Sequence, residues 1–169
     1  MYPSARSIAR KLSSFETPTV VMTVGIPGSG KSTVVEQING YLEWPILRSD
    51  GIRAELTGSE SDLSQDETVW QLLEERALAY IESGQSFFVD ATHNTLFSRE
   101  FGSRSYRFMG ANAIIALRVN VPVDLAIKRN DSRERSVPQN AILRMDNNLK
   151  QDPVSIANGF NEVITVSNE

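Results

Sequence analysis

Nine consecutive residues constrain the fold of this chain more than any other segment: GIPGSGKST, from Gly25 to Thr33. The first eight satisfy the pattern G-x-x-x-x-G-K-[ST], and they directly follow the β-branched run from Thr19 to Val24. Between a strand and a helix, such glycines let backbone N–H groups turn around a phosphate, and the helix N-terminus adds positive potential. The segment therefore predicts a strand, a phosphate-binding loop and a helix from Ser32 to about Tyr41.

The loop pattern also assigns roles to individual residues. Lys31 is expected to bridge the β- and γ-phosphates and so to act in catalysis, and Ser32 is expected to hold Mg²⁺ through its hydroxyl. Further contacts to the nucleotide are expected from Gly28, Ser29, Gly30 and Thr33. A GTPase would need an N-K-x-D motif, which the sequence lacks. ATP and Mg²⁺ are therefore the predicted cofactors.

Strand-like and helix-like segments alternate along the rest of the chain. Further strands are expected at 45–48, 86–89, 113–121 and 162–166, and further helices at 4–15, 52–56, 65–83, 98–109, 123–129 and 140–149. Five strands separated by helices predict an α/β chain with the P-loop NTPase fold, a five-stranded parallel sheet with helices on both faces. Ligands of such sheets bind at the carboxyl ends of the strands, so the chemistry is expected there.

Length and composition set outer bounds on the function. A chain of 169 residues suits one domain, so residues 1–169 are expected to form a single domain with a helical extension at 1–17. The absence of cysteine excludes disulfides and thiolate metal sites. No apolar run approaches the ~20 residues of a membrane span, and we expect a cytoplasmic protein. The sequence predicts no oligomeric state.

The charge is unevenly distributed along the chain. The net charge is −4, which argues against a molecule that binds nucleic acid over its whole surface. However, residues 97–150 contain ten basic and five acidic residues, whereas residues 36–96 contain three basic and twelve acidic ones. Most of these charges are expected on solvated helix faces. Any polyanion is expected to contact the second half of the chain.

Asp90 ends the apolar run Phe87 to Val89 and is the candidate for a second Mg²⁺ ligand. A carboxylate at the end of a buried strand beside the loop can reach the metal through water. The alternative is that Asp90 only caps the following turn.

Asp50 and Arg53 form a second group, at the end of the short strand at 45–48. A kinase needs a carboxylate at this edge to orient and deprotonate the attacking hydroxyl, so Asp50 is a candidate catalytic base. Arg53 lies three residues further on and shares a helix face with it, which suits an acceptor that carries a phosphate or a similar anion. The alternative is an N-cap aspartate, Ser49 being the other candidate cap, paired with a helix arginine.

A third group is the polar segment from Lys128 to Arg135. Arg129 and Arg133 are four residues apart, and we expect them to project together from a helical lid over the γ-phosphate. The interleaved Asp131 and Glu134 leave open a solvated, salt-bridged helix end instead.

With these groups in this order, the chain resembles the kinase domain of the polynucleotide 5′-hydroxyl kinase family, as found in phage and bacterial end-healing enzymes. The resemblance spans about Val20 to Val166. It rests on the glycine-rich loop, Ser49 to Arg53, Val89 to Thr92, the lid from Arg129 to Pro138, and Gly159 to Ile164. The wider group with this pattern also contains small-molecule kinases and zeta-type toxins.

The resemblance implies a role for each motif residue. Lys31 and Ser32 would serve ATP and Mg²⁺, Asp50 would be the general base, and Arg53 would hold the phosphate next to the acceptor hydroxyl. Arg133 matches the family's lid arginine best, with Arg129 beside it on the nucleotide, although the lid spacing differs by about a residue and leaves Arg135 a candidate.

The sequence departs from the family pattern at His93, which stands directly after Asp-Ala-Thr where the family usually has asparagine. His93 is expected to be a surface loop residue, with a substrate contact as the alternative. Phosphatase and ligase domains, which often accompany the end-healing kinases, are not recognisable in the 169 residues. A small-metabolite kinase and a non-catalytic nucleotide-binding module therefore remain alternatives. Trp44 and Trp70 are expected in the core rather than on a base-stacking surface.

Overall fold

The computed structural model describes residues 2–168, which fold around one five-stranded sheet in the order β2-β3-β1-β4-β5. Every pair of neighbouring strands is parallel. The strands are β1 (Thr19–Val24), β2 (Ile46–Arg48), β3 (Phe87–Asp90), β4 (Ala113–Asn120) and β5 (Glu162–Ser167). The predicted five-stranded parallel sheet and the P-loop fold are confirmed.

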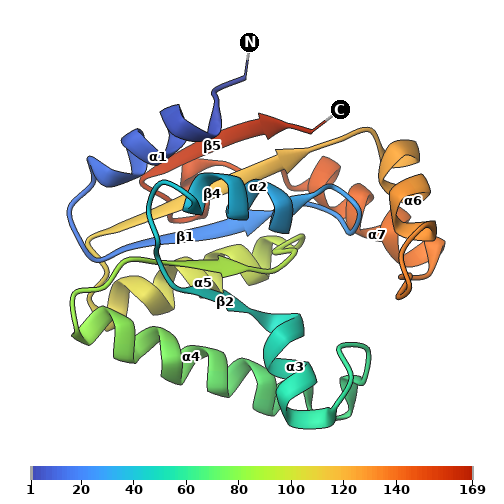
Figure 1. Ribbon diagram of the computed structural model, residues 1–169, viewed down its shortest axis with the longest axis horizontal. Helices are drawn as coiled ribbons and strands as arrows, with labels where there is room; N and C mark the ends of the chain where they lie inside the picture. The colour runs from blue at the N-terminus through green and yellow to red at the C-terminus, as the bar shows by residue number, and fades with distance from the viewer. Residues whose placement is uncertain (1, 169) are drawn as a thin grey trace.

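Seven α-helices connect and cover the described strands (Figure 1). They are α1 (Ala5–Ser13), α2 (Lys31–Asn39), α3 (Ser49–Thr57), α4 (Asp66–Glu82), α5 (Leu96–Met109), α6 (Val123–Asp131) and α7 (Gln139–Gln151). Each predicted helix is present, with ends that differ from the prediction by up to three residues. The sequence did not predict two short 3₁₀ helices, Leu63–Gln65 and Ile156–Asn158. The single domain over 1–169 stays a prediction, and its ends, Met1 and Glu169, lie outside the described residues.

The sheet is buried on both faces, as its apolar strands predict. Every residue of β1 is buried, and alternate side chains join two different clusters. One cluster packs the sheet against α4 and α5, and the other packs it against α1 and α2. The predicted covering of both faces is confirmed. No helix among residues 2–168 is both long enough and apolar enough to span a bilayer.

The buried face of α4 leaves out Trp70, which we expected in the core. The buried residues are Val69, Leu73, Ala77 and Ile81, whereas Trp70 is 39% exposed. The prediction that Trp70 belongs to the core is wrong, because Val69 occupies the inward position of that turn. Trp44 is partly buried, with its ring 5.7 Å from that of Phe88.

Strand register brings the functional segments to one edge of the sheet. Arg48, the last residue of β2, pairs with Asp90, the last residue of β3, and β1 beside them leads directly into the glycine-rich loop. Figure 1 shows this carboxyl edge with α6 and α7 beyond it.

Candidate functional site

The glycine-rich loop has the backbone conformation that its glycines allow. Gly28 and Gly30 have φ values of 82° and 87°, in the left-handed region that other residues adopt with strain. A Cβ atom on Gly28 would lie 2.2 Å from the carbonyl oxygen of Ala126 in α6, and one on Gly30 would lie 2.0 Å from Asn168 Nδ2. The loop therefore packs against α6 and against the segment that follows β5, and only glycine fits at either position.

Lys31 is the first residue of α2 and is partly buried beneath the loop. Its Nζ donates a 3.0 Å hydrogen bond to the carbonyl of Ile26, and it forms no ion pair within residues 2–168. The pKa of the Lys31 ammonium is lowered to about 8, chiefly by burial; the charge of Asp90 acts against this shift, the charge of Arg133 adds to it, and the charge of Asp50 acts against it. A half-buried cation without a bonded carboxylate suits an anionic ligand such as a triphosphate.

Ser32 and Asp90 come together although they are 58 residues apart. The Ser32 hydroxyl donates a 2.7 Å hydrogen bond to Asp90 Oδ2, and Arg48 Nε donates to the same oxygen at 3.3 Å. Asp90 is 7% exposed. The hydroxyl of Thr23, in the neighbouring strand, lies 3.4 Å from the other oxygen and donates to the Ala91 carbonyl at 2.7 Å.

One hydroxyl and one carboxylate suit Mg²⁺, which usually takes one or two protein oxygens and completes its shell with substrate phosphates and water. No group of three or more His, Cys, Asp or Glu side chains within residues 2–168 forms a self-sufficient metal site. The side chains present therefore fit a metal that arrives with a nucleotide.

Asp50 lies in the first turn of α3, which begins at Ser49 rather than at the predicted Ile52. The prediction that Ser49 or Asp50 caps this helix is wrong: Arg48 occupies the N-cap position, without a side-chain cap bond. A carboxylate in the first turn is favoured by the helix dipole. The Asp50 side chain is 56% exposed and near enough to Lys31 to influence its pKa.

Arg53 is buried beside Asp50, with a side chain that is 7% exposed. Its guanidinium donates to Asp50 Oδ1 at 2.6 Å, to Asp66 Oδ1 at 2.7 and 2.9 Å, and to the Glu60 carbonyl at 3.2 Å. The sequence pattern did not indicate Asp66 as a partner. In this arrangement Arg53 fixes the position of Asp50, and most of its donors are already used.

The lid differs from the predicted helix. Helix α6 ends at Asp131, so Arg129 lies on the helix and Arg133 lies beyond it. The expectation that both project together from one helix is wrong. Asn130 explains the ending: its buried side chain donates to the Val137 carbonyl at 2.8 Å and accepts from the Val137 N–H at 2.9 Å. These two bonds join the end of α6 to Val137, so the residues between them form a loop instead of another helical turn.

The three lid arginines have different environments. Arg129 donates to the carbonyl of Asn168 at 2.7 Å, and the Asn168 side chain donates to the Ser29 carbonyl at 3.0 Å. Arg133 is exposed, and its charge lowers the pKa of Lys31. Arg135 lies 3.5 Å from Asp50 Oδ2 and 3.1 Å from a carboxylate oxygen of Glu60. The charge of Arg133 thus acts on the lysine of the phosphate loop, whereas Arg135 contacts the candidate base, Asp50.

His93 is buried, with 5% of its surface exposed, so the prediction of a surface loop residue is wrong. Its Nδ1 lies 2.6 Å from the carbonyl oxygen of Thr23. Because a carbonyl only accepts, Nδ1 carries the proton and Nε2 is left as an acceptor. The pKa of His93 is lowered to about 4, chiefly by burial; the bond to Thr23 and the charge of Asp90 act against this shift, and the charges of Lys31 and Arg99 add to it. The ring is therefore neutral.

The backbone of His93 is also unusual, because its φ of 42° lies in the left-handed region. Arg99, which is fully buried, donates to the His93 carbonyl at 3.2 Å and holds this turn in place. The only sequence signal was a single histidine directly after Asp-Ala-Thr. Nothing in the sequence pattern indicated the roles of Asn130 and Asn168.

A family model described as an AAA domain matches residues 20–151. No curated protein matches the sequence closely enough to show a relationship.

Solved structures share the fold at low sequence identity. A chain of the Pnkp1/Rnl/Hen1 RNA repair complex has a TM-score of 0.71 and 23% identity; the match covers 83% of this chain and 47% of that one. A candidate kinase from Chloroflexus aurantiacus J-10-fl has a TM-score of 0.66 and 20% identity; the match covers 90% of this chain and 86% of that one. Shikimate kinase from Acinetobacter baumannii, solved with shikimate, has a TM-score of 0.57 and 18% identity; the match covers 95% of this chain and 89% of that one. The chain thus spans about half the length of the RNA repair protein.

Proposed function

Since the chain belongs to the AAA domain family that matches residues 20–151, we propose that it is an ATP-dependent kinase that transfers the γ-phosphate of ATP to a hydroxyl group. The acceptor we favour is the 5′-hydroxyl of a polynucleotide or a nucleotide-like molecule. Asp50 is the observation that carries this proposal. It is an exposed carboxylate at the carboxyl edge of the sheet, and its charge acts on the phosphate-loop lysine, Lys31. A module that only binds nucleotide needs no carboxylate at this position.

In the proposed reaction, Asp50 accepts the proton of the acceptor hydroxyl as its oxygen bonds to the γ-phosphorus and the bond to the β-phosphate oxygen breaks, leaving ADP. Lys31 and Arg133 stabilise the negative charge on the transferred group. Arg53 holds the Asp50 carboxylate in place through its 2.6 Å bond. Bound by Ser32 and Asp90, Mg²⁺ would neutralise phosphate charge.

Three features favour a phosphate-bearing acceptor such as a polynucleotide. Arg135 places a guanidinium 3.5 Å from Asp50, which suits an anion next to the acceptor hydroxyl. The fold is also shared with a chain of an RNA repair complex. The basic segment 97–150 supplies further positive charge on the same chain.

A small-metabolite kinase is the second candidate, and the state of Arg53 favours it. Its guanidinium is buried and already bonded to Asp50 and Asp66, so it has little capacity left to hold an incoming phosphate. The likeness in fold to shikimate kinase, over most of both chains, is compatible with this alternative.

An acceptor screen with radiolabelled ATP tests the proposal. Purified protein with Mg²⁺ is incubated with 5′-hydroxyl RNA and DNA oligonucleotides, matched 5′-phosphorylated oligonucleotides, nucleosides and common sugars and hydroxy acids. We expect label on the 5′-hydroxyl oligonucleotides and none on the matched 5′-phosphorylated ones. Label on a metabolite alone would support the second candidate, and ATP binding without transfer to any acceptor would support a non-catalytic module.

A further inference from the structure

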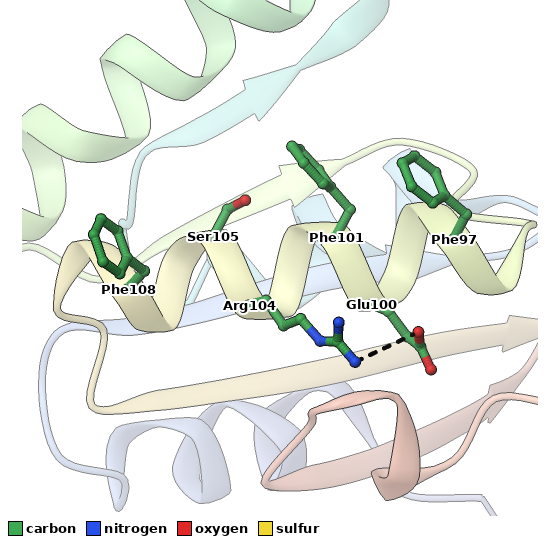
Figure 2. A pocket seen from close by; sticks show the side chains of 6 residues that line it. All are labelled: Phe97, Glu100, Phe101, Arg104, Ser105 and Phe108. Atoms are coloured by element: carbon green, nitrogen blue, oxygen red, sulfur yellow. Dashed lines mark ion pairs between the residues drawn. The ribbon is translucent and has the colours of Figure 1, made fainter.

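Helix α5 has an exposed aromatic surface on the side opposite its packed face. Phe97, Phe101 and Phe108 are 75%, 52% and 95% exposed. With Glu100, Arg104 and Ser105 they line one shallow hollow, and we call these six residues the aromatic stripe (Figure 2). The rings of Phe97 and Phe101 stack at a centroid distance of 5.7 Å. No other element within residues 2–168 covers this stripe.

The stripe exposes more apolar surface than isolated surface residues do. A phenylalanine side chain buries roughly 150–250 Å² when covered, so the three rings expose on the order of 400 Å² together. Continuous patches of about 300–600 Å² on a monomer are often functional. A standard interface buries about 800 Å² on each partner, so the rings would supply roughly half of one.

The six positions of the stripe are spaced symmetrically along α5. The six positions are symmetric about the point between Gly102 and Ser103, so an antiparallel copy of α5 places Phe97 of one chain against Phe108 of the other. Glu100 and Arg104 lie together on one side of the stripe, where they form an ion pair of 3.8 Å within the chain. In the antiparallel pair, Glu100 of each chain lies beside Arg104 of the other.

From the exposed phenylalanines, their spacing and the placement of Glu100 and Arg104 we propose that two copies of this chain form a symmetric dimer in solution through antiparallel pairing of their α5 helices. A twofold axis repeats each contact, so the Phe97–Phe108 and Glu100–Arg104 contacts each occur twice. A nucleic-acid strand fits the stripe less well, because its one arginine is balanced by one glutamate and gives no net attraction to a polyanion.

Cysteine cross-linking tests the antiparallel register, and the chain contains no cysteine that would interfere. Phe97→Cys and Phe108→Cys are prepared separately, one with a tag that changes its mobility on a gel. Mixed under mild oxidation, they are expected to form a disulfide-linked heterodimer, whereas each variant alone forms little. In the antiparallel pair two copies of position 97 lie about 16 Å apart along the helix axis, too far for a disulfide. Efficient cross-linking of Phe97→Cys alone would overturn the proposed arrangement.

Sedimentation equilibrium tests the dimer itself. The wild-type chain is expected to show a concentration-dependent monomer–dimer equilibrium, and Phe108→Glu is expected to raise the dissociation constant at least tenfold. Tyr41→Glu is the matched control, because Tyr41 is 60% exposed on α2's side of the molecule and lies outside the stripe. Circular dichroism melting checks that each variant folds. A wild-type chain that stays monomeric at hundreds of micromolar, or a Phe108→Glu variant that dimerises as well as the wild type, would overturn the proposal.

Discussion

The hydroxyl of Ser32, in the first turn of α2, donates a 2.7 Å hydrogen bond to the carboxylate of Asp90, the last residue of β3. The bond joins the end of the glycine-rich loop to a neighbouring strand of the sheet. It also places together the two side chains that the sequence assigned to the metal. Because Arg48 donates to the same carboxylate oxygen, the Asp90 side chain is held in place by two donors.

Replacing Asp90 by asparagine should weaken the response to Mg²⁺ more than it weakens the fold. The change removes the one buried negative charge next to Ser32 and keeps the shape of the side chain. We expect the Mg²⁺ concentration for half-maximal ATP turnover to rise at least tenfold. Glu36→Gln is the control, because Glu36 also pairs with Arg48, at 2.9 Å, but is exposed. If the Mg²⁺ concentration for half-maximal turnover changed equally in both variants, Asp90 would not be a metal ligand.

Lys31→Met should abolish transfer while leaving stability unchanged or higher. The ammonium is partly buried with only the Ile26 carbonyl as a bonded partner, so the free protein gains little from its charge. Its loss from the transition state should cost about 3 kcal/mol or more, which is a rate reduction of at least about 100-fold. Urea unfolding measures the stability of the variant, and steady-state turnover of the same preparation measures its activity. A fall of about 3 kcal/mol in the free energy of unfolding, as large as the expected loss of transition-state stabilisation, would contradict this account of Lys31.

His93 should make the protein less stable at acidic pH. Its pKa is about 4 in the folded state and about 6.5 when unfolded, so between these values the unfolded chain binds the extra proton. The stability that neutral His93 contributes to the folded protein is therefore fully present above about pH 6.5, and it is lost as the pH falls towards 4. Between pH 7 and pH 4.5 the loss should be about 2 kcal/mol.

His93→Asn is the matched variant for this prediction. Asparagine tolerates the left-handed backbone and retains an N–H that can bond to the Thr23 carbonyl, but it does not titrate. Urea unfolding at both pH values should show a smaller fall in the free energy of unfolding for the variant than for the wild type. An equal fall in both proteins would show that His93 is not the group responsible.

The lid arginines should separate in their kinetic effects. Arg133 acts on Lys31, so Arg133→Ala is expected to lower kcat by roughly 10²–10³-fold with little change in the KM for the acceptor. Arg135 contacts Asp50 and Glu60, so Arg135→Ala is expected to raise the acceptor KM instead. Steady-state kinetics with ATP and acceptor varied separately distinguish the two. The opposite assignment would make Arg135 the residue that serves the transferred phosphate.

Most of the architecture was predictable because it depends on local patterns. The β-branched run of β1, the glycine-rich loop and the alternation of strands and helices are sufficient for a parallel sheet with helices on both faces. In the first turns of α4 the prediction chose Trp70 for the core although Val69 is the buried residue, since both fit an apolar stripe and only packing decides between them.

The site was harder to predict because its geometry depends on contacts that are distant in sequence. Asp66 holds Arg53 from 13 residues away, and Asn130 ends α6 by bonding to the backbone of Val137. His93, in the turn after β3, is buried and bonds to the carbonyl of Thr23 in β1. None of these bonds produces a periodic pattern, so a sequence reading assigns such polar side chains to the surface.

The most direct test of the account compares wild-type protein with Asp50→Asn in a single-turnover transfer of the γ-phosphate from Mg-ATP to a 5′-hydroxyl oligonucleotide. Asparagine keeps the size of the side chain and cannot accept the hydroxyl proton, so transfer should slow by about 10²–10⁴-fold while ATP binding stays within a few-fold of the wild type. Wild-type transfer to the oligonucleotide together with this selective loss is the predicted result. An Asp50→Asn variant that transfers phosphate at the wild-type rate would contradict the central claim that Asp50 is the catalytic base.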